Sequence, residues 1–255
     1  MIPLKDNIPT RRFPVLTVAL ILINVFVYFF LQHGGITHGP SDNEVVRWGL
    51  IPYEVTHPGK HCDLVPGGTV ACEGQSHVTG TASNQPNTWV TFFTSIFMHG
   101  GLLHIAGNML FLWIFGNNIE DSMDRWRFAL FYLLGGAVAN FAQIAVGPSS
   151  TAPGIGASGA IAAVLGGYAL LYPRARVITA VILIFFITLL DLPALIVLGG
   201  WFVLQIIDAA VNNPLNGGVA YFAHIGGFAF GLLLIKLFAN RVHRDYEQVN
   251  RLPVY

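Results

Sequence analysis

The sequence contains few charged residues. Of its 255 residues, 10% are Asp, Glu, Lys or Arg, compared with about 25% in a typical soluble domain. The mean hydropathy is +0.60, and 54% of the residues are hydrophobic. This composition is too apolar for a single soluble core and indicates an integral membrane protein. The formal net charge is zero, so it favours no nucleic-acid partner, and we expect none.

The N-terminal region lacks the cleavage site of a signal peptide. Residues 1–12 carry three basic residues, and the apolar run 13–31 that follows has no A-x-A pattern after it. A removed signal peptide would end in such a pattern. We therefore expect a retained first membrane span at 13–31, with 1–12 as a cytoplasmic segment.

Apolar segments long enough to cross a bilayer occur six times. A hydrocarbon core of about 30 Å needs about 20 apolar residues in a helix, and a helix satisfies its own backbone in lipid. We therefore predict an all-α bundle of six transmembrane helices. The predicted spans are 13–31, 95–117, 128–146, 156–172, 192–210 and 220–238, with a long loop at 32–94 and a polar tail at 239–255.

A seventh apolar stretch, 177–190, is too short for a span and closes on Asp191 and Pro193. At this length an interfacial or re-entrant helix is the better interpretation.

The basic residues are distributed unequally between the two sides of the predicted bundle. The loops 147–154 and 212–218 carry no charge. Lys and Arg concentrate on the cytoplasmic side of membrane proteins, so both termini are predicted to be cytoplasmic. The residues on that side are 11 of the 13 basic ones: Lys5, Arg11, Arg12, Arg125, Arg127, Arg174, Arg176, Lys236, Arg241, Arg244 and Arg251.

Cysteine is scarce, and both cysteines, Cys62 and Cys72, lie in the loop 32–94. In an oxidising compartment two such residues indicate first a disulfide that closes a small loop. A metal site that includes His61 and His77 is an alternative, although the spacing matches no zinc finger or ribbon; free thiols are another. We expect neither a metal nor a cofactor.

Polar side chains within the predicted spans are few, and each is a functional candidate because burial in lipid is costly. Hydrogen bonding between helices is the structural alternative, and we prefer it for Asn140, Gln143 and Gln205. The complete set is His104, Asn108, Asn140, Gln143, Ser158, Gln205, Asp208 and His224.

Three of these side chains share one depth in the membrane. With 1.5 Å of rise per residue, His104, Ser158 and His224 fall within roughly 3–8 Å of the outer helix ends. Ser158 follows a glycine-rich turn, which includes Gly156, and enters a helix whose unpaired N–H groups suit a developing oxyanion. His224 is the base that could activate this serine.

Small residues near the serine and the histidine would allow their helices to approach closely. Gly227-x-x-x-Gly231 forms a small-xxx-small face on the last span. These glycines could serve packing alone, but packing does not explain the serine and histidine beside them.

His104 and Asn108 are four residues apart and so share one face of the second span. Their N–H groups could act as side-chain donors to the oxyanion. The alternative is a polar pair that tethers this span to its neighbours.

Together these residues resemble the rhomboid family of intramembrane serine proteases. The resemblance covers roughly residues 89–235, and the combination of motifs is highly specific. The matching residues are Gly156-Ala157-Ser158-Gly159, Ala223-His224-Ile225-Gly226-Gly227 with Gly231, His99, His104 and Asn108, and Gly116 with Glu120.

The resemblance implies a six-helix rhomboid-like bundle, with 95–238 as the catalytic core, and a Ser–His dyad. Ser158 would be the nucleophile and His224 the general base and then acid. His104 and Asn108 would stabilise the oxyanion together with the backbone N–H of Ser158 and the Gly156 turn.

The implied substrates are single-pass membrane proteins, cleaved in a helix-destabilised stretch near the outer leaflet, with the loop 212–218 as a movable cap. The expected partners are therefore membrane-protein substrates and the lipid bilayer, and the sequence indicates no particular oligomeric state. The expected location is the cell membrane, with the active site toward the extracytoplasmic side.

The sequence departs from the family pattern in two places. Rhomboids often have an aromatic residue four positions after the serine, stacked on the histidine, whereas this sequence has Ala162; another contact must then orient His224. The frequent Trp-Arg pair before the second span is matched only at Trp89, since Val90 follows. Asp208 could complete a triad, but the resemblance argues against it.

Two other functions compete with a protease. A catalytically silent relative that escorts membrane proteins would usually have lost Ser158 or His224. A small transporter would have polar residues across the bilayer and often an internal repeat, and neither is visible.

Overall fold

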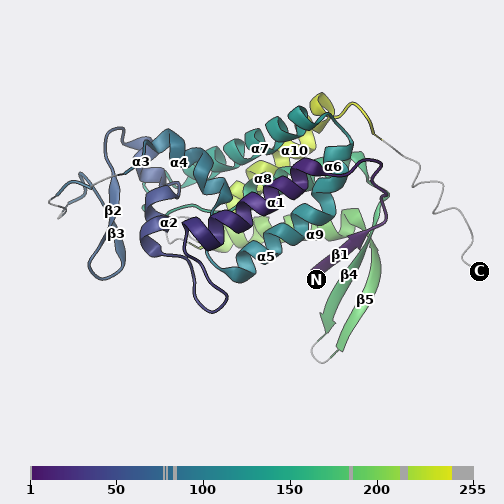
Figure 1. Cartoon of the computed structure of the whole chain (residues 1–255), viewed down its shortest axis with the longest axis horizontal. Coiled ribbons are helices and arrows are strands. Elements are labelled where there is room, and N and C mark those ends of the chain that lie inside the picture. The colour runs from purple at the N-terminus through teal and green to yellow at the C-terminus, as the bar shows by residue number, and fades with distance from the viewer. Residues whose placement is uncertain are drawn as a thin grey trace, which may run out of the picture.

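The computed structural model describes residues 2–76, 78, 80–82, 85–183, 186–212 and 218–242. Most of the described chain is helical, as Figure 1 shows. The helices are α1 (Val15–Phe26), α2 (Asp42–Trp48), α3 (Pro52–Thr56), α4 (Thr88–Thr94), α5 (Leu102–Phe111), α6 (Asn117–Asp121), α7 (Arg125–Val146), α8 (Ser158–Leu171), α9 (Ala194–Val211) and α10 (Tyr221–Phe238). A π-helical segment extends α1 to Leu31, another at Leu112–Gly116 joins α5 to α6, and a 3-10 turn at Ser95–Phe97 follows α4.

Four of the described helices are long and apolar enough to cross a membrane: Leu102–Asp121, Arg125–Val146, Ala194–Val211 and Tyr221–Phe238. A mostly helical membrane protein is therefore confirmed, but the prediction of an all-α fold is wrong, because the described chain also forms two small sheets. Helices also occupy the other two predicted spans, but Val15–Leu31 and Ser158–Leu171 are shorter than 18 residues. The number of six spans and the side of the termini stay predictions, and most of the tail 239–255 lies outside the described residues.

The short helix α8 lies at the centre of the bundle, packed against α7, α9 and α10 (Figure 1). Twelve of its 14 residues are buried, so its neighbours shield it on almost every side. A helix enclosed in this way does not need the full length of a lipid-exposed span. Its first residue is Ser158.

Glycines bring α8 and α10 into close contact. A methyl group on Gly227 would overlap the carbonyl oxygen of Gly159, and one on Gly231 would overlap that of Ala163. The backbones therefore touch without side chains between them, as small-xxx-small faces permit.

The stretch 177–190 is not a helix, and the prediction of an interfacial or re-entrant helix is wrong. It lies within an antiparallel hairpin of β4 (Arg176–Leu183) and β5 (Phe186–Pro193), paired from Arg176 with Pro193 to Leu183 with Phe186. The run is rich in Val, Ile and Thr, which favour strands. The edge of β4 is covered by β1 (Ile2–Asp6), which pairs with it antiparallel, and the hairpin projects from one end of the bundle (Figure 1).

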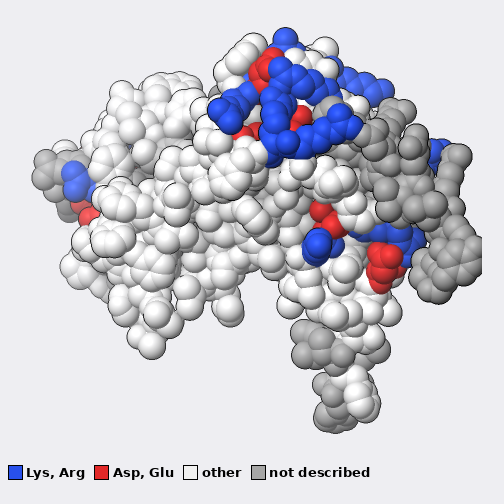
Figure 2. All heavy atoms as spheres, turned by 45° about the vertical axis from the view of Figure 1, so that its right-hand side comes forward, with Lys and Arg blue, Asp and Glu red and all other residues white. Residues whose placement is uncertain are grey.

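Basic residues gather around that same end of the molecule, where Figure 2 shows the Lys and Arg side chains clustered. We call it the basic end. Acidic partners there tie the helices together: Arg12 pairs with Asp121, and Arg241 pairs with Asp124. Glu120 caps the start of α1 by accepting the N–H groups of Leu16 at 3.0 Å and Thr17 at 2.7 Å. This contact joins the first helix to α6.

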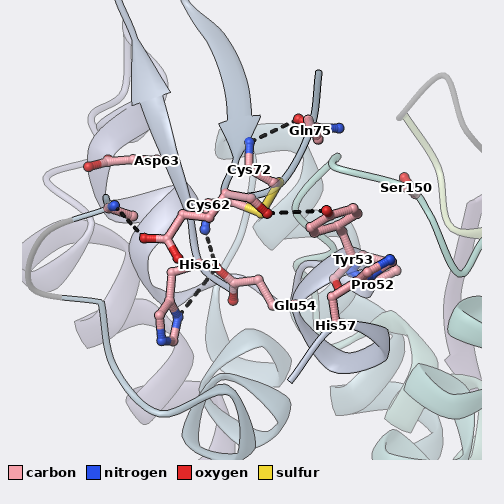
Figure 3. The surroundings of a disulfide bond; sticks show 12 residues. Pro52, Tyr53, Glu54, His57, His61, Cys62, Asp63, Cys72, Gln75 and Ser150 are labelled. Atoms are coloured by element: carbon pink, nitrogen blue, oxygen red, sulfur yellow. Dashed lines mark hydrogen bonds and ion pairs between the residues drawn. A yellow bond between two sulfur atoms is a disulfide. The ribbon is translucent and has the colours of Figure 1, made fainter. Parts of the chain in front are cut away.

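The opposite end carries a small hairpin of β2 (Cys62–Val65) and β3 (Thr69–Cys72). Cys62 and Cys72 lie opposite each other in its register and form a disulfide, shown in Figure 3. The bond takes both thiols away from the alternative metal site, and His77 lies outside the described residues. Glu54 accepts the N–H of Cys62 at 2.7 Å, and burial raises the pKa of its carboxyl group. We call this the disulfide end.

Candidate active site

The turn before α8 fixes the position of Ser158. Gly156 has a φ of +136°, a value that favours glycine. Its N–H donates to the carbonyl of Ser95 at 2.9 Å. A Cβ atom on Gly156 would lie 3.0 Å from Nε2 of His104 and 3.4 Å from Oγ of Ser158. The turn thus leaves open the space between these two side chains.

Ser158 and His224, predicted as nucleophile and base, are hydrogen-bonded. Oγ of Ser158 lies 2.7 Å from Nε2 of His224, and the histidine is buried in the first turn of α10. The serine stands at the first position of α8, where backbone N–H groups have no partner within the helix. The close contact between α8 and α10 at their glycines brings the two side chains within hydrogen-bonding distance.

The other ring nitrogen of His224 meets a residue of α9. Nδ1 lies 2.6 Å from Oε1 of Gln205, and the ring of Trp201 lies 5.6 Å from the imidazole, tilted by 40°. Trp201 and Gln205 are four residues apart and so share one face of α9. The contact of Nδ1 is therefore with Gln205 and not with Asp208.

The sequence analysis prefers interhelical hydrogen bonding for Gln205, and the contact with His224 is such a bond between α9 and α10; that its partner is the predicted base was not foreseen. An available signal was its spacing from Trp201, which places an aromatic ring and an amide on one helix face. Asn140 and Gln143 do form interhelical bonds: Asn140 donates to the carbonyl of Phe92 at 2.9 Å, and Gln143 accepts the N–H of Ala223 at 3.3 Å.

His104 and Asn108 lie on α5, on the other side of the serine. The N–H of Gly100 donates to Nδ1 of His104 at 3.3 Å. A neutral imidazole that accepts at Nδ1 carries its proton on Nε2, and Nε2 faces Gly156. The Nδ2 atom of Asn108 is buried and has no hydrogen-bond partner within the described part of the chain. Both residues therefore offer a donor near Ser158.

His99 belongs to the packing around this site. It is fully buried, and its ring meets that of His104 edge-on, with 5.2 Å between centroids. Its backbone N–H donates to Oε1 of Gln32 at 2.8 Å, and Nε2 of Gln32 donates back to its carbonyl at 3.0 Å. This reciprocal pair fastens the loop before α5 to the end of the first helix.

Two cavities meet at Ser158. A cleft of about 940 Å³ is lined by residues of α5, α8, α9 and α10. A second cavity of about 350 Å³ lies on the side of Ser158 that faces α7. The cleft brings the predicted site residues onto one surface: His104, Asn108, Ser158 and His224, with Trp201. Residues 213–217 of the predicted cap lie outside the described part of the chain.

A sequence model of a known family, described as the Rhomboid domain, matches residues 86–241, more than half of the chain. The chain belongs to the rhomboid family. Several rhomboid proteins are similar to it over part of their length. The human mitochondrial presenilin-associated rhomboid-like protein is 32% identical over 164 residues, which are 62% of this chain and 40% of that protein.

Two further rhomboids come from other kingdoms. The rhomboid protease GluP of Bacillus subtilis (strain 168) is 40% identical over 84 residues, covering 33% of this chain and 16% of that protein. The chloroplastic rhomboid-like protein 11 of Arabidopsis thaliana is 27% identical over 170 residues, which cover 63% of this chain and 56% of that protein. The matched region spans about 40% of the length of the presenilin-associated relatives.

The expected location in the cell membrane is wrong on this comparison. The presenilin-associated relatives are named mitochondrial and the Arabidopsis relative chloroplastic, which points to an organellar membrane. Hydropathy and basic residues reveal that helices cross a bilayer and in which direction. They carry no information on which membrane it is.

Proposed function

We propose that this rhomboid protein is an intramembrane serine endopeptidase that cleaves transmembrane segments of other membrane proteins. The observation that carries the proposal is the 2.7 Å contact between Oγ of Ser158 and Nε2 of His224. A serine hydroxyl is a weak nucleophile until an adjacent base accepts its proton. The dyad supplies that base within a cleft of the bundle.

The chemistry follows from the positions of the donors and acceptors. Oγ of Ser158 attacks the scissile carbonyl while Nε2 of His224 takes its proton. The resulting oxyanion accepts hydrogen bonds from the backbone N–H of Ser158, Nδ2 of Asn108 and Nε2 of His104. His224 then gives the proton to the leaving amine, and water hydrolyses the acyl-enzyme with His224 again as the base.

The shape of the site indicates how a substrate would bind. The cleft lies between α5 and α9 and carries apolar residues, among them Phe111, Leu165 and Trp201. A transmembrane segment could enter there from the lipid. Its carbonyl groups are hydrogen-bonded while it is helical, so cleavage requires a stretch that unwinds easily, such as one with Gly or Pro. The dyad lies toward the disulfide end, so cleavage would occur near the leaflet on that side.

The proposed setting is an organellar membrane, crossed six times, with both termini on the side of the basic end. Support comes from the organellar relatives and from the clustered basic residues (Figure 2). On this proposal the natural substrates are membrane proteins of the same organelle.

The test is cleavage of a model transmembrane substrate by the purified protein in liposomes. We expect Ser158→Ala and His224→Ala each to abolish cleavage without loss of folding. Ser41→Ala is the matched control, because Ser41 precedes α2 and its side chain makes no cap hydrogen bond. Cleavage retained by Ser158→Ala would refute the mechanism, and binding without cleavage by the wild type would favour an escort protein.

A further inference from the structure

We propose that Gln205 is the positioning residue of the dyad: its side-chain oxygen fixes the tautomer and the orientation of the His224 imidazole. The inference rests on the proposed function, because it gives Gln205 a part in the same reaction. Gln205 touches neither Ser158 nor the space for the substrate carbonyl, and it acts through His224.

The hydrogen bonds of the imidazole are complete only with Gln205. Oε1 of Gln205 lies 2.6 Å from Nδ1, and Oγ of Ser158 lies 2.7 Å from Nε2. A neutral imidazole has one proton. An acceptor at Nδ1 holds that proton there and leaves the lone pair of Nε2 directed at the serine hydroxyl. In the other tautomer, Nε2 would carry the proton and could not accept a second one.

Gln205 also supplies the contact to His224 that α8 does not provide. The residue four positions after Ser158 is Ala162, which is fully buried. A Cβ atom on Gly227 would lie 3.3 Å from the Ala162 methyl group, so an aromatic ring at 162 would not fit this tight helix crossing. The ring of His224 is held instead from α9, by Gln205 at its edge and by Trp201 at 5.6 Å.

A neutral amide suits this place in the molecule. Gln205 is buried on α9, whereas its neighbours Leu204 and Ile206 are exposed on the outer surface of the helix. A carboxylate at Gln205 would stabilise the imidazolium more strongly but would bring a charge into the membrane. The amide oxygen fixes the tautomer without that cost.

Two substitutions that keep nearly the same side-chain length distinguish a positioning role of Gln205 from a packing role. Gln205→Met keeps the volume and removes the acceptor, whereas Gln205→Glu keeps an acceptor oxygen. A positioning role predicts that kcat falls most in Gln205→Met, on the order of 100-fold or more, with KM unchanged. For comparison, disabling the group that orients the histidine of a Ser-His-Asp triad costs about 10⁴-fold. A packing role predicts the opposite order, since methionine is apolar and glutamate would bury a charge.

The pH–rate profile adds a readout that packing does not change. In Gln205→Glu, a carboxylate stabilises the imidazolium, so the base is lost at a higher pH and the acidic limb of the profile moves upward. The other titratable groups around the dyad are His38 and His104 in the cleft and Tyr221 in the cavity behind Ser158. They are unchanged in both variants, and Leu204→Met serves as the control on the same helix, with wild-type kcat expected.

Nitrogen-15 NMR of the His224 ring tests the inference without relying on cleavage. We expect a single Nδ1–H tautomer in the wild-type protein and a mixture, or the Nε2–H form, in Gln205→Met. If the wild type shows this tautomer but never cleaves a substrate, the proposed function fails and the positioning role stands. If Gln205→Met keeps both the single tautomer and the wild-type kcat, the positioning role is refuted.

Discussion

At the scale of single residues, Asn108 has an unused hydrogen-bonding atom at the candidate site. Nδ2 of Asn108 has no hydrogen-bond partner within the described residues, and a buried donor without a partner costs free energy. Its place beside Ser158 in the cleft gives that donor a use once an oxyanion forms. The same atom therefore offers a way to separate a catalytic from a structural role.

Substitution of Asn108 by Ala should lower kcat by about 10²–10³-fold, as for the loss of one oxyanion donor. Since Nδ2 makes no hydrogen bond within the part of the chain that the structure describes, the free energy of unfolding should not fall by more than the loss of packing. Unfolding in detergent and cleavage in liposomes measure the two quantities. A variant that is much less stable but turns over substrate normally would show that Asn108 tethers α5 to its neighbours.

Asp6 is a titratable residue of interest at the basic end. Its Oδ2 atom accepts from the Tyr168 hydroxyl at 2.7 Å and from Nδ2 of Asn118 at 2.5 Å. Burial, opposed chiefly by the Tyr168 hydrogen bond, raises the pKa of Asp6 from 3.8 to about 6. The folded state thus favours the protonated acid, and this contribution to stability is complete below pH 3.8 and lost as the pH rises through 6.

Asp6→Asn should therefore stabilise the protein at pH 7.5 relative to the wild type, by at most about 3 kcal/mol. The advantage should disappear near pH 4, where the wild-type acid is protonated. Thermal unfolding in detergent at both pH values measures the difference between the two proteins. An equal difference at both pH values would show that the raised pKa of Asp6 does not affect stability.

The sequence singles out Ser158, His224, His104 and Asn108, because ionisable and hydrogen-bonding side chains stand out in apolar spans. The structure brings all four into one cleft, and their roles in catalysis stay predictions. The sequence was not sufficient to predict the contact of Gln205 with His224. Helical spacing defines the face on which a side chain lies, but not which neighbouring helix that face meets. An amide also has many structural uses in a bundle, so the contact with His224 needed the packing of α9 against α10.

At the scale of helices and strands, the contact between α8 and α10 brings the dyad together. The carbonyl groups of Gly159 and Ala163 on α8 lie against Gly227 and Gly231 of α10, where a methyl group would overlap them. Any increase in this separation moves Ser158 away from His224. The glycine pattern was visible in the sequence, and the structure shows which carbonyl each glycine faces.

We expect Gly231→Ala to push α8 and α10 apart, which destabilises the bundle by about 1–3 kcal/mol and reduces cleavage. Gly200→Ala on α9 is the matched control, since a Cβ atom there meets nothing within 4 Å. The free energy of unfolding and the cleavage rate should both distinguish the two variants. Equal behaviour of the two alanine variants would mean that close packing does not hold the dyad.

The β4–β5 hairpin is an element whose secondary structure was predicted wrongly from the sequence. Its length and hydropathy suggested a short interfacial helix, yet its Val, Ile and Thr residues prefer strands, and β1 supplies the strand partner for β4. That partner comes from residues more than 170 positions away along the chain, since Ile2 pairs with Ala180. The local sequence pattern of a strand does not indicate a partner strand so far away along the chain. The location of this hairpin at the membrane surface stays a prediction.

At the scale of the whole molecule, the two ends of the bundle differ in chemistry. The basic end carries the Arg12–Asp121 and Arg241–Asp124 pairs and the three-stranded sheet, and the disulfide end carries the Cys62–Cys72 bond (Figures 1 and 3). The assignment of these two ends to the two sides of a membrane stays a prediction. The relatives point to an organellar membrane, which the charge pattern does not indicate.

The central claim is that Ser158 is an activated nucleophile in the folded protein. Incubation of the purified protein in liposomes with a fluorophosphonate probe, followed by peptide mass spectrometry, tests it most directly. We expect one adduct on Ser158 in the wild type and loss of labelling in His224→Ala. A folded wild-type protein that stays unlabelled at Ser158, or a His224→Ala protein labelled there just as fast, would contradict it.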